Sequence, residues 1–169
     1  MWYVIQTMSG QEDSLVKMVK KQLSKECYAD CFYIKREYTL KIGGEYRVYL
    51  KPLFPAYVFI QTDSPEEVYF ELKNIPKLSK LLASEGEMFL RVAEDEQEFL
   101  ESIQDETHVV RRSLVRVDEE GQIVAAEGAL GEYLGCMVRQ RLRKRSVWIE
   151  KELLGEVREI LLGVRLETD

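Results

Sequence analysis

The pattern of hydrophobic residues changes at about residue 105, and this change constrains the fold more than any other feature. Before it, runs with the two-residue period of strands alternate with runs that have helical spacing. After it, short strand-like runs are punctuated by Gly121, Gly128, Gly131, Gly135, Gly155 and Gly163. We therefore predict an α+β fold in two parts, an α/β sandwich followed by a small β-barrel.

The first part is predicted to hold an antiparallel sheet with flanking helices, in the order β-α-β-β-β-α-β-α. The glycine pair Gly43-Gly44 lies between two alternating runs, which is typical of a β-hairpin. The other expected elements are strands over 2–6, 31–34, 57–60 and 89–92, helices over 12–23, 65–73 and 95–103, and a loop over 75–86.

The domain boundaries follow from the same patterns. We expect a first domain at residues 1–105, a linker at 106–112 and a second domain at 113–169.

Composition excludes several classes of protein. The chain is 46% hydrophobic and 32% charged, which is typical of a globular protein, and it has no apolar run long enough to span a membrane. Its N-terminus begins as a strand and lacks the pattern of a secretory signal, so a cytoplasmic location is expected. We expect no membrane association.

Metal binding and catalysis have little support in the sequence. The three cysteines and the single histidine could supply four zinc ligands in number, but Cys27 and Cys31 have no second close pair to match them. We expect reduced thiols, no metal and no cofactor. His108 is a lone candidate for a general base within the predicted linker, and the usual nucleotide-binding and hydrolase motifs are missing, so we expect a protein that is not an enzyme.

Positive charge is concentrated in one predicted hairpin. The chain has a net charge of −6, yet residues 139–151 carry six basic side chains against one acidic, a net of +5. The basic residues are Arg139, Arg141, Arg143, Lys144, Arg145 and Lys151. Strand alternation predicts that Arg139, Arg141 and Arg143 form one row, and such rows match the phosphates of a nucleic-acid backbone. The alternative is an edge strand kept soluble by charge.

Large aromatic side chains gather in the first part. Trp2 and Tyr3 lie in the first strand, and Phe54, Tyr57 and Phe59 lie in or beside the strand at 57–60. Part of this set exceeds what a core of this size hides, so we expect an exposed aromatic patch that docks a partner; ordinary core packing is the alternative.

Three segments resemble the NusG family. The opening Trp2–Glu12 and the segment Lys51–Phe59 are similar to two signatures of its N-terminal (NGN) domain. The segment Gly128–Val138 is similar to a KOW motif, whose final glycine would be Gly135. The resemblance covers both parts of the chain in the family's order.

This resemblance implies a transcription elongation factor that binds RNA polymerase. The aromatic face of the NGN domain would lie on the clamp helices of the largest polymerase subunit. Phe54 and Tyr57 are the best matches to the contacting residues, with Trp2 and Phe59 as weaker ones. A monomer is expected.

The chain departs from the common NusG pattern at two places. Ala56 stands where a glycine is usual, and the KOW-like segment continues into the arginine-rich hairpin. In these respects the chain is most similar to specialised paralogues of the LoaP kind, which bind an RNA hairpin in the nascent leader and promote processive antitermination.

Two other hypotheses remain open. One is a general elongation and coupling factor whose KOW domain binds a ribosomal or termination protein. The other is a small enzyme acting on RNA or nucleotides, with carboxylates as metal ligands.

Overall fold

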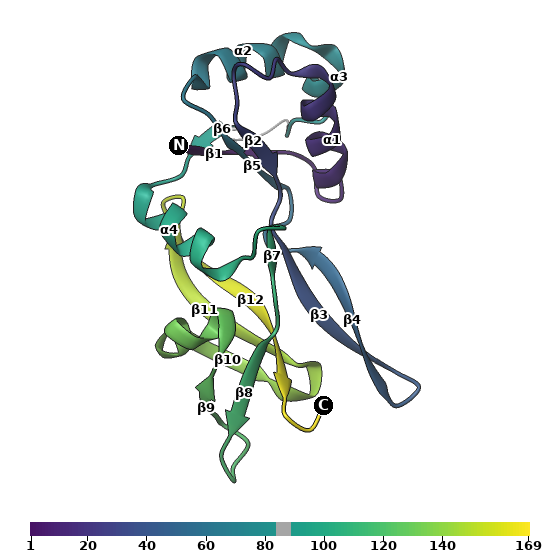
Figure 1. The fold of residues 1–169 in the computed structure, drawn as a ribbon, viewed down its shortest axis with the longest axis vertical. Coiled ribbons are helices and arrows are strands. Elements are labelled where there is room, and N and C mark those ends of the chain that lie inside the picture. Colours follow the sequence, from purple (N-terminus) through teal and green to yellow (C-terminus); the bar gives the residue numbers. More distant parts are fainter. Residues whose placement is uncertain (84–88) are drawn as a thin grey trace. The chain divides into compact units, whose positions relative to one another are not determined.

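The computed structural model describes residues 1–83 and 89–169, whose contacts divide the chain into two compact units (Figure 1). Unit 1 comprises Met1–Ile34 and Phe54–Gln97, and unit 2 comprises Lys35–Leu53 and Glu98–Asp169. The contacts therefore group the hairpin before residue 54 with the C-terminal strands, whereas the predicted division at 105–113 follows chain order. Hairpin periodicity is a local property and does not reveal which part of the chain the hairpin packs against.

Unit 1 contains a four-stranded antiparallel sheet in the order β2-β5-β1-β6. Its strands are β1 (Trp2–Gln6), β2 (Asp30–Phe32), β5 (Tyr57–Gln61) and β6 (Phe89–Arg91). The predicted strands are confirmed at these places, and the central strand β5 is buried from Val58 to Ile60, as its uninterrupted apolar sequence requires.

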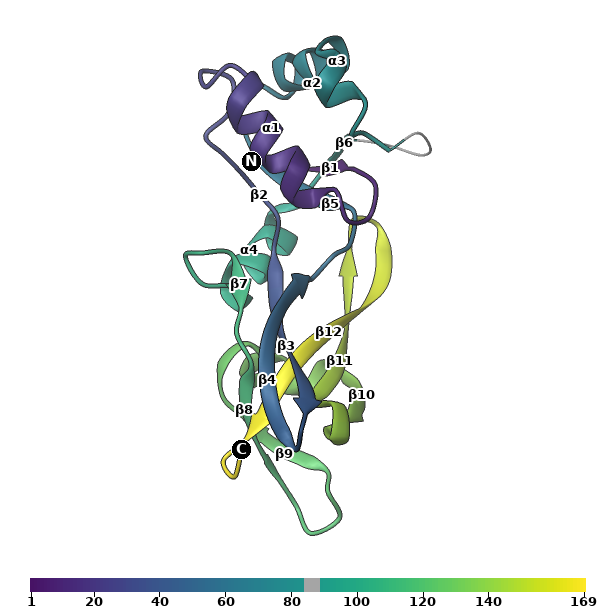
Figure 2. The ribbon, with the colours of Figure 1, turned by 90° about the vertical axis from the view of Figure 1, so that its right-hand side faces the viewer.

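Helices cover one face of this sheet (Figure 2). They are α1 (Glu12–Gln22), α2 (Pro65–Asn74) and α3 (Pro76–Ser79). Leu15 and Val19 of α1 and Leu72 of α2 pack with Ile5 and Val58 of the sheet in one buried core. The predicted loop over 75–86 contains α3, and its residues 84–86 lie outside the described part of the chain. The helix predicted at 95–103 is α4 (Glu94–Ile103).

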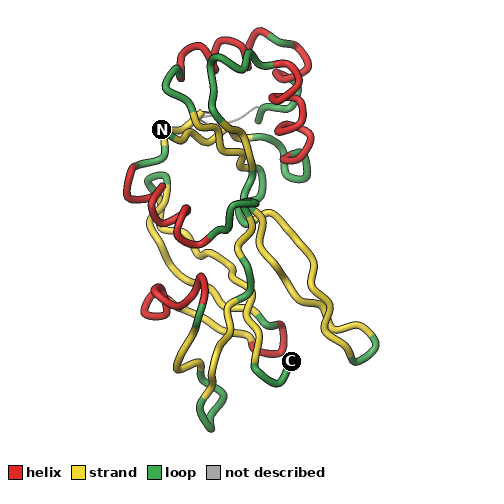
Figure 3. Tube along the Cα trace, viewed as in Figure 1, coloured by secondary structure: helices red, strands yellow, loops and turns green. Residues whose placement is uncertain are grey.

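Unit 2 consists mainly of strands in two sheets, ordered β4-β3-β7 and β10-β11-β12-β8-β9 (Figure 3). Its strands are β3 (Lys35–Ile42), β4 (Glu45–Pro52), β7 (Val109–Val110), β8 (Ser113–Val117), β9 (Ile123–Ala126), β10 (Met137–Arg141), β11 (Ser146–Leu153) and β12 (Glu156–Leu166). Two short 3-10 helices, η1 (Gly128–Cys136) and η2 (Leu142–Lys144), complete it. The predicted hairpin around Gly43-Gly44 is confirmed as β3–β4.

The segment predicted as a linker, 106–112, has regular structure of its own. Strand β7 pairs in parallel with β3, and the Asp105 carboxylate accepts hydrogen bonds from the backbone N–H groups of Thr107 and Val109 and from Arg111 Nε at 2.7 Å. Burial acts to raise the pKa of Asp105, but a hydrogen bond from the Thr107 hydroxyl and the bonds just named outweigh it and hold that pKa well below its usual value. The pairing of β7 with β3 holds this segment against the hairpin of unit 2, and the hydrogen bonds to Asp105 hold its backbone in a defined turn.

Gly163 lies where β12 comes close to β3. A β-carbon added there would overlap the backbone carbonyl oxygen of Glu37 and lie 3.2 Å from Arg112 Cγ. Gly163→Ala is therefore expected to lower the free energy of unfolding by about 1–3 kcal/mol, because the two backbones must separate. Urea denaturation measures the change. Gly135→Ala, where the added carbon meets nothing within 4 Å, is the control, and an equal effect of both variants would contradict the argument.

The described ranges contain no helix long and apolar enough to cross a membrane.

Candidate functional site

The sheet face of unit 1 opposite the helices carries a cluster of aromatic rings. Side chains alternate across a strand, so Trp2 and Phe59 point away from the core that Ile5 and Val58 join. The Trp2 ring lies 5.0 Å from that of Phe32 and 5.9 Å from that of Phe59, measured between centroids. Face and edge contacts of this kind stabilise the cluster beyond simple area burial.

The four predicted polymerase-contacting residues divide into two pairs. Trp2 is 5% exposed and Phe59 is 2% exposed, so both are core residues, and the expectation that they present surface to a partner is wrong. Phe54 and Tyr57 are half-buried, with ring centroids 6.4 Å apart, and Phe54 also contacts Phe59. The accessible aromatic surface is therefore the pair Phe54 and Tyr57, supported from beneath by Phe59.

A buried carboxylate organises the turn that carries this pair. Glu12 is 3% exposed, and its carboxylate accepts the backbone N–H of Gly10 at 2.7 Å and that of Ala56 at 3.4 Å. Ala56 has φ of 74°, a left-handed conformation that favours glycine. Its carbonyl accepts the N–H of Thr7 at 2.8 Å. These bonds tie the turn between Phe54 and Tyr57 to the start of α1.

Glu12→Ala is expected to lower the free energy of unfolding by about 1–3 kcal/mol, because the two backbone donors lose their buried acceptor. Thermal or urea denaturation measures the loss. Asp13→Ala is the matched control in the same helical turn: its exposed carboxylate pairs with Lys17 at 2.7 Å, so its removal should cost about 0.5 kcal/mol or less. Similar losses in the two variants would show that burial of Glu12 has no special role.

The basic hairpin of unit 2 brings two arginines onto one indole ring. Arg139 pairs with Trp148 across β10 and β11, and Arg141 pairs with Ser146, which places these side chains on the same face. The guanidinium carbons of Arg139 and Arg141 lie 4.2 Å and 5.9 Å from the centroid of the Trp148 ring. The arginines are exposed and the indole is half-buried, so cations and a stacking surface are presented together.

Gln140 fixes the direction of the intervening strand. Its side-chain amide nitrogen donates to the carbonyl of Gly121 at 2.8 Å, and its side-chain oxygen accepts the N–H of Ile123 at 3.1 Å. The Gln140 side chain therefore points to the opposite face of β10 from Arg139 and Arg141, as strand alternation predicts.

The predicted row of three arginines is interrupted after Arg141. Residues 142–144 form η2, so Arg143 lies exposed on a helical turn, next to the exposed Lys144, rather than on the strand. A bulge between Met137 and Arg139 also breaks the alternation at the start of β10. Alternation alone does not reveal where a strand ends. In place of a row of three arginines, the structure has Arg139 and Arg141 on β10 and Arg143 and Lys144 on the turn η2.

Two of the six predicted RNA-binding residues have other roles. Arg145, at φ of 49°, donates from Nε and Nη2 to the Asp169 carboxylate at 2.8 and 2.7 Å, and this bond raises its pKa. Lys151 lies on the opposite face of β11 from Trp148, with its Nζ 5.0 Å from the centroid of the Phe99 ring. Neither side chain joins the cluster around Trp148, so the six basic residues do not form one surface, and RNA contacts of Arg145 and Lys151 stay a prediction.

The charge of Arg139 is partly neutralised by Glu159, because Arg139 Nη2 lies 3.3 Å from Glu159 Oε2. No ion pair within 4 Å is seen for Arg141, Arg143 or Lys144 among the described residues. The basic surface is hereafter defined as Arg139, Arg141, Arg143 and Lys144 with Trp148.

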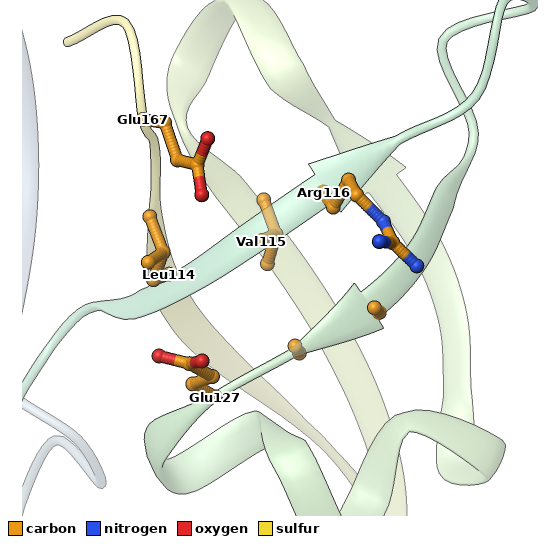
Figure 4. A pocket seen from close by; sticks show the side chains of 7 residues that line it. Leu114, Val115, Arg116, Glu127 and Glu167 are labelled. Carbon is orange, nitrogen blue, oxygen red and sulfur yellow. The ribbon is translucent and has the colours of Figure 1, made fainter.

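A pocket of about 180 Å³ is lined mainly by residues of β8 and β9 (Figure 4). Leu114 lines it together with the carboxylates of Glu127 and Glu167, which Figure 4 shows on either side of Leu114. Arg116 also lines the pocket, but two carboxylates against one guanidinium give its lining a net negative charge, which disfavours a phosphate. Within residues 1–83 and 89–169, no group of three or more His, Cys, Asp or Glu side chains is arranged to hold a metal ion.

Comparison with known proteins gives consistent results. Residues 1–101 match the family model named NusG and described as transcription termination factor nusG. A protein named transcription termination/antitermination protein NusG from Rickettsia bellii is 25% identical over 174 residues, covering 96% of this chain and 86% of the relative. Its namesake from Rickettsia prowazekii is 21% identical with the same coverage.

A solved structure titled "Domain interaction in Thermotoga maritima NusG" has a TM-score of 0.53 at 18% identity. The match covers 96% of this chain and 92% of that one. This likeness supports the mixed fold of helices and sheets.

Proposed function

Because the chain belongs to the NusG family, we propose that it is a transcription termination/antitermination factor that acts on RNA polymerase. The names of its relatives indicate this class of activity. The protein would act by binding, as a monomer in the cytoplasm, without catalysis or a cofactor. A ligand that binds one polymerase state more tightly than another shifts the population toward that state.

The polymerase contact is proposed to centre on Phe54 and Tyr57, docked on the clamp helices of the largest subunit. Their half-buried rings rest on a packed aromatic layer, so little side-chain entropy remains to be lost on binding. Aromatic anchors of this kind commonly carry most of the energy of an interface.

More specifically, we propose that the protein is a LoaP-like processive antiterminator that binds an RNA hairpin in the nascent leader. The observation that carries this proposal is the basic surface around Trp148, four exposed cations in a chain of net charge −6. An acidic protein is repelled by nucleic acid in general, so a local basic surface with Trp148 at its centre favours one shaped RNA over many. The proposed division is a polymerase-binding domain at 1–105, a linker at 106–112 and a KOW-type β-barrel at 113–169.

Tethering explains how such a factor would select its operon. Binding to an RNA hairpin that emerges from one polymerase raises the local concentration of the protein there, and the aromatic pair then docks in an intramolecular step.

The alternative is a general NusG factor whose KOW domain binds a ribosomal or termination protein. The ion pairs of Arg139 with Glu159 and of Arg145 with Asp169 favour it, because they neutralise part of the basic charge.

Sequencing the RNA that crosslinks to the protein in cells separates the two. One strongly enriched leader hairpin is expected for the specialised factor. RNA spread over all transcribed genes, with ribosomal or termination proteins retained in a pull-down, would assign the general function instead.

A further inference from the structure

The β3–β4 hairpin of unit 2 carries a second group of aromatic and basic side chains, on one face. The strand register places Tyr38 opposite Tyr49 and Arg36 opposite Lys51. Because alternate residues share a face, these four side chains lie together, with Arg47 two positions from Tyr49. The face is accessible: Tyr49 is 37% exposed, and Arg47 and Lys51 are exposed.

The cations on this face lie against the rings. The centroids of Tyr38 and Tyr49 are 5.6 Å apart, with the ring planes 34° from each other. Lys51 Nζ lies 4.4 Å from the Tyr38 centroid, and the Arg36 guanidinium carbon lies 5.7 Å from it. Two neighbouring aromatic surfaces bordered by cations can stack successive bases while the charges meet the backbone phosphates.

The tip of the hairpin also contacts Arg145, the residue that follows the basic turn η2. Tyr46, on the opposite face of the hairpin, lies between two cations: the Arg145 guanidinium carbon is 4.5 Å from its ring centroid and Lys41 Nζ is 5.3 Å from it. Arg145 directly follows η2, which carries Arg143 and Lys144. The hairpin and the basic surface therefore belong to one unit. The contact joins the residue that follows η2 to the face of the hairpin opposite Tyr38 and Tyr49.

We propose that the Tyr38–Tyr49 face of the β3–β4 hairpin stacks the bases of single-stranded RNA that flanks the structured hairpin held by the basic surface. The choice of RNA rather than DNA rests on the proposed function. Toward the tip this face also carries Leu40 and Ile42, which are exposed, and one acidic residue, Glu45. A nucleic acid fits the part around the rings better than an apolar protein segment does, because Arg36, Arg47 and Lys51 border the two tyrosines.

The test measures fluorescence anisotropy of a labelled 12-nucleotide uridine RNA, which forms no hairpin, with the full-length protein. Replacing both tyrosines, Tyr38→Leu with Tyr49→Leu, is expected to weaken binding at least tenfold, because loss of stacking costs about 1–3 kcal/mol per base. Tyr38→Phe with Tyr49→Phe keeps both rings and should bind within about twofold of the wild type. Val48→Ala with Leu50→Ala, on the opposite face, should leave the affinity unchanged.

Equal affinity of the wild type and the leucine variant for this RNA would overturn the inference, as would equal affinity of the wild type for a 12-nucleotide thymidine DNA. Loss of a captured protein partner by the leucine variant, with unchanged RNA affinity, would assign the face to protein and also overturn it. Failure of the proposed function has a different signature, because wild-type protein would then show no preference for a leader hairpin over other RNA.

Discussion

Replacing Arg141 and Arg143 by glutamate is expected to reduce the affinity for the leader RNA hairpin by at least about 100-fold. Each replacement changes a positive charge into a negative one on an exposed side chain of the basic surface. A charge-assisted hydrogen bond to a phosphate is worth about 1.5–3 kcal/mol, and two lost bonds account for that factor before repulsion is added. A mobility-shift titration at about 0.1 M salt measures it.

The salt dependence of binding adds a second readout. Each lost phosphate contact should reduce the slope of log affinity against log salt by about 0.7–0.9. The matched control is Arg116→Glu with Arg165→Glu, which makes the same change of charge at exposed positions on β8 and β12. If the control weakened binding as much, the effect would come from net charge, and the basic surface would have no special role.

Arg145 is not suitable for this test, although the sequence places it in the same basic run. Its guanidinium holds the Asp169 carboxylate, and both side chains are only 11% exposed. A charge reversal there would leave two acids in contact at the end of the chain and would confuse a loss of stability with a loss of binding.

Local patterns predicted most of the elements correctly. The apolar spacing from Leu15 to Val19 predicted the buried face of α1 correctly, and Gly43-Gly44 predicted the position of the turn between β3 and β4. The pairing of Arg139 with Trp148 on one face also follows from alternation, because that rule depends only on the strand geometry of neighbouring residues.

Properties that depend on distant partners could not be predicted in this way. Trp2 and Phe59 are large aromatic residues of the kind that binding surfaces use. That they instead pack against each other and against Phe32 depends on how the strands pair, which the sequence does not show. The acids that pair with Arg139 and Arg145 lie 20 and 24 residues further along the chain. No spacing rule connects such positions. The surfaces predicted from the sequence, aromatic and basic, are therefore larger than those in the structure.

The second large effect is expected at the aromatic pair. Phe54→Ala with Tyr57→Ala should weaken binding to RNA polymerase at least about 30-fold, because truncation of a central aromatic anchor commonly costs 2 kcal/mol or more. Binding of the labelled protein to purified core polymerase, followed by anisotropy, measures this loss. The fold should survive, because both rings are half-buried in the structure and neither belongs to the core between the sheet and the helices.

Two controls separate a lost contact from a lost fold. Phe70→Ala removes a phenylalanine that is 66% exposed on α2, away from the aromatic pair in sequence, and should leave polymerase affinity unchanged. Trp2→Ala removes a buried ring and should lower the free energy of unfolding by about 3–5 kcal/mol, which denaturation detects directly. If the Phe54 and Tyr57 variant lost stability to the same degree as the Trp2 variant, its weak binding would reflect unfolding. If it stayed folded and bound polymerase normally, the contact surface would lie elsewhere on the protein.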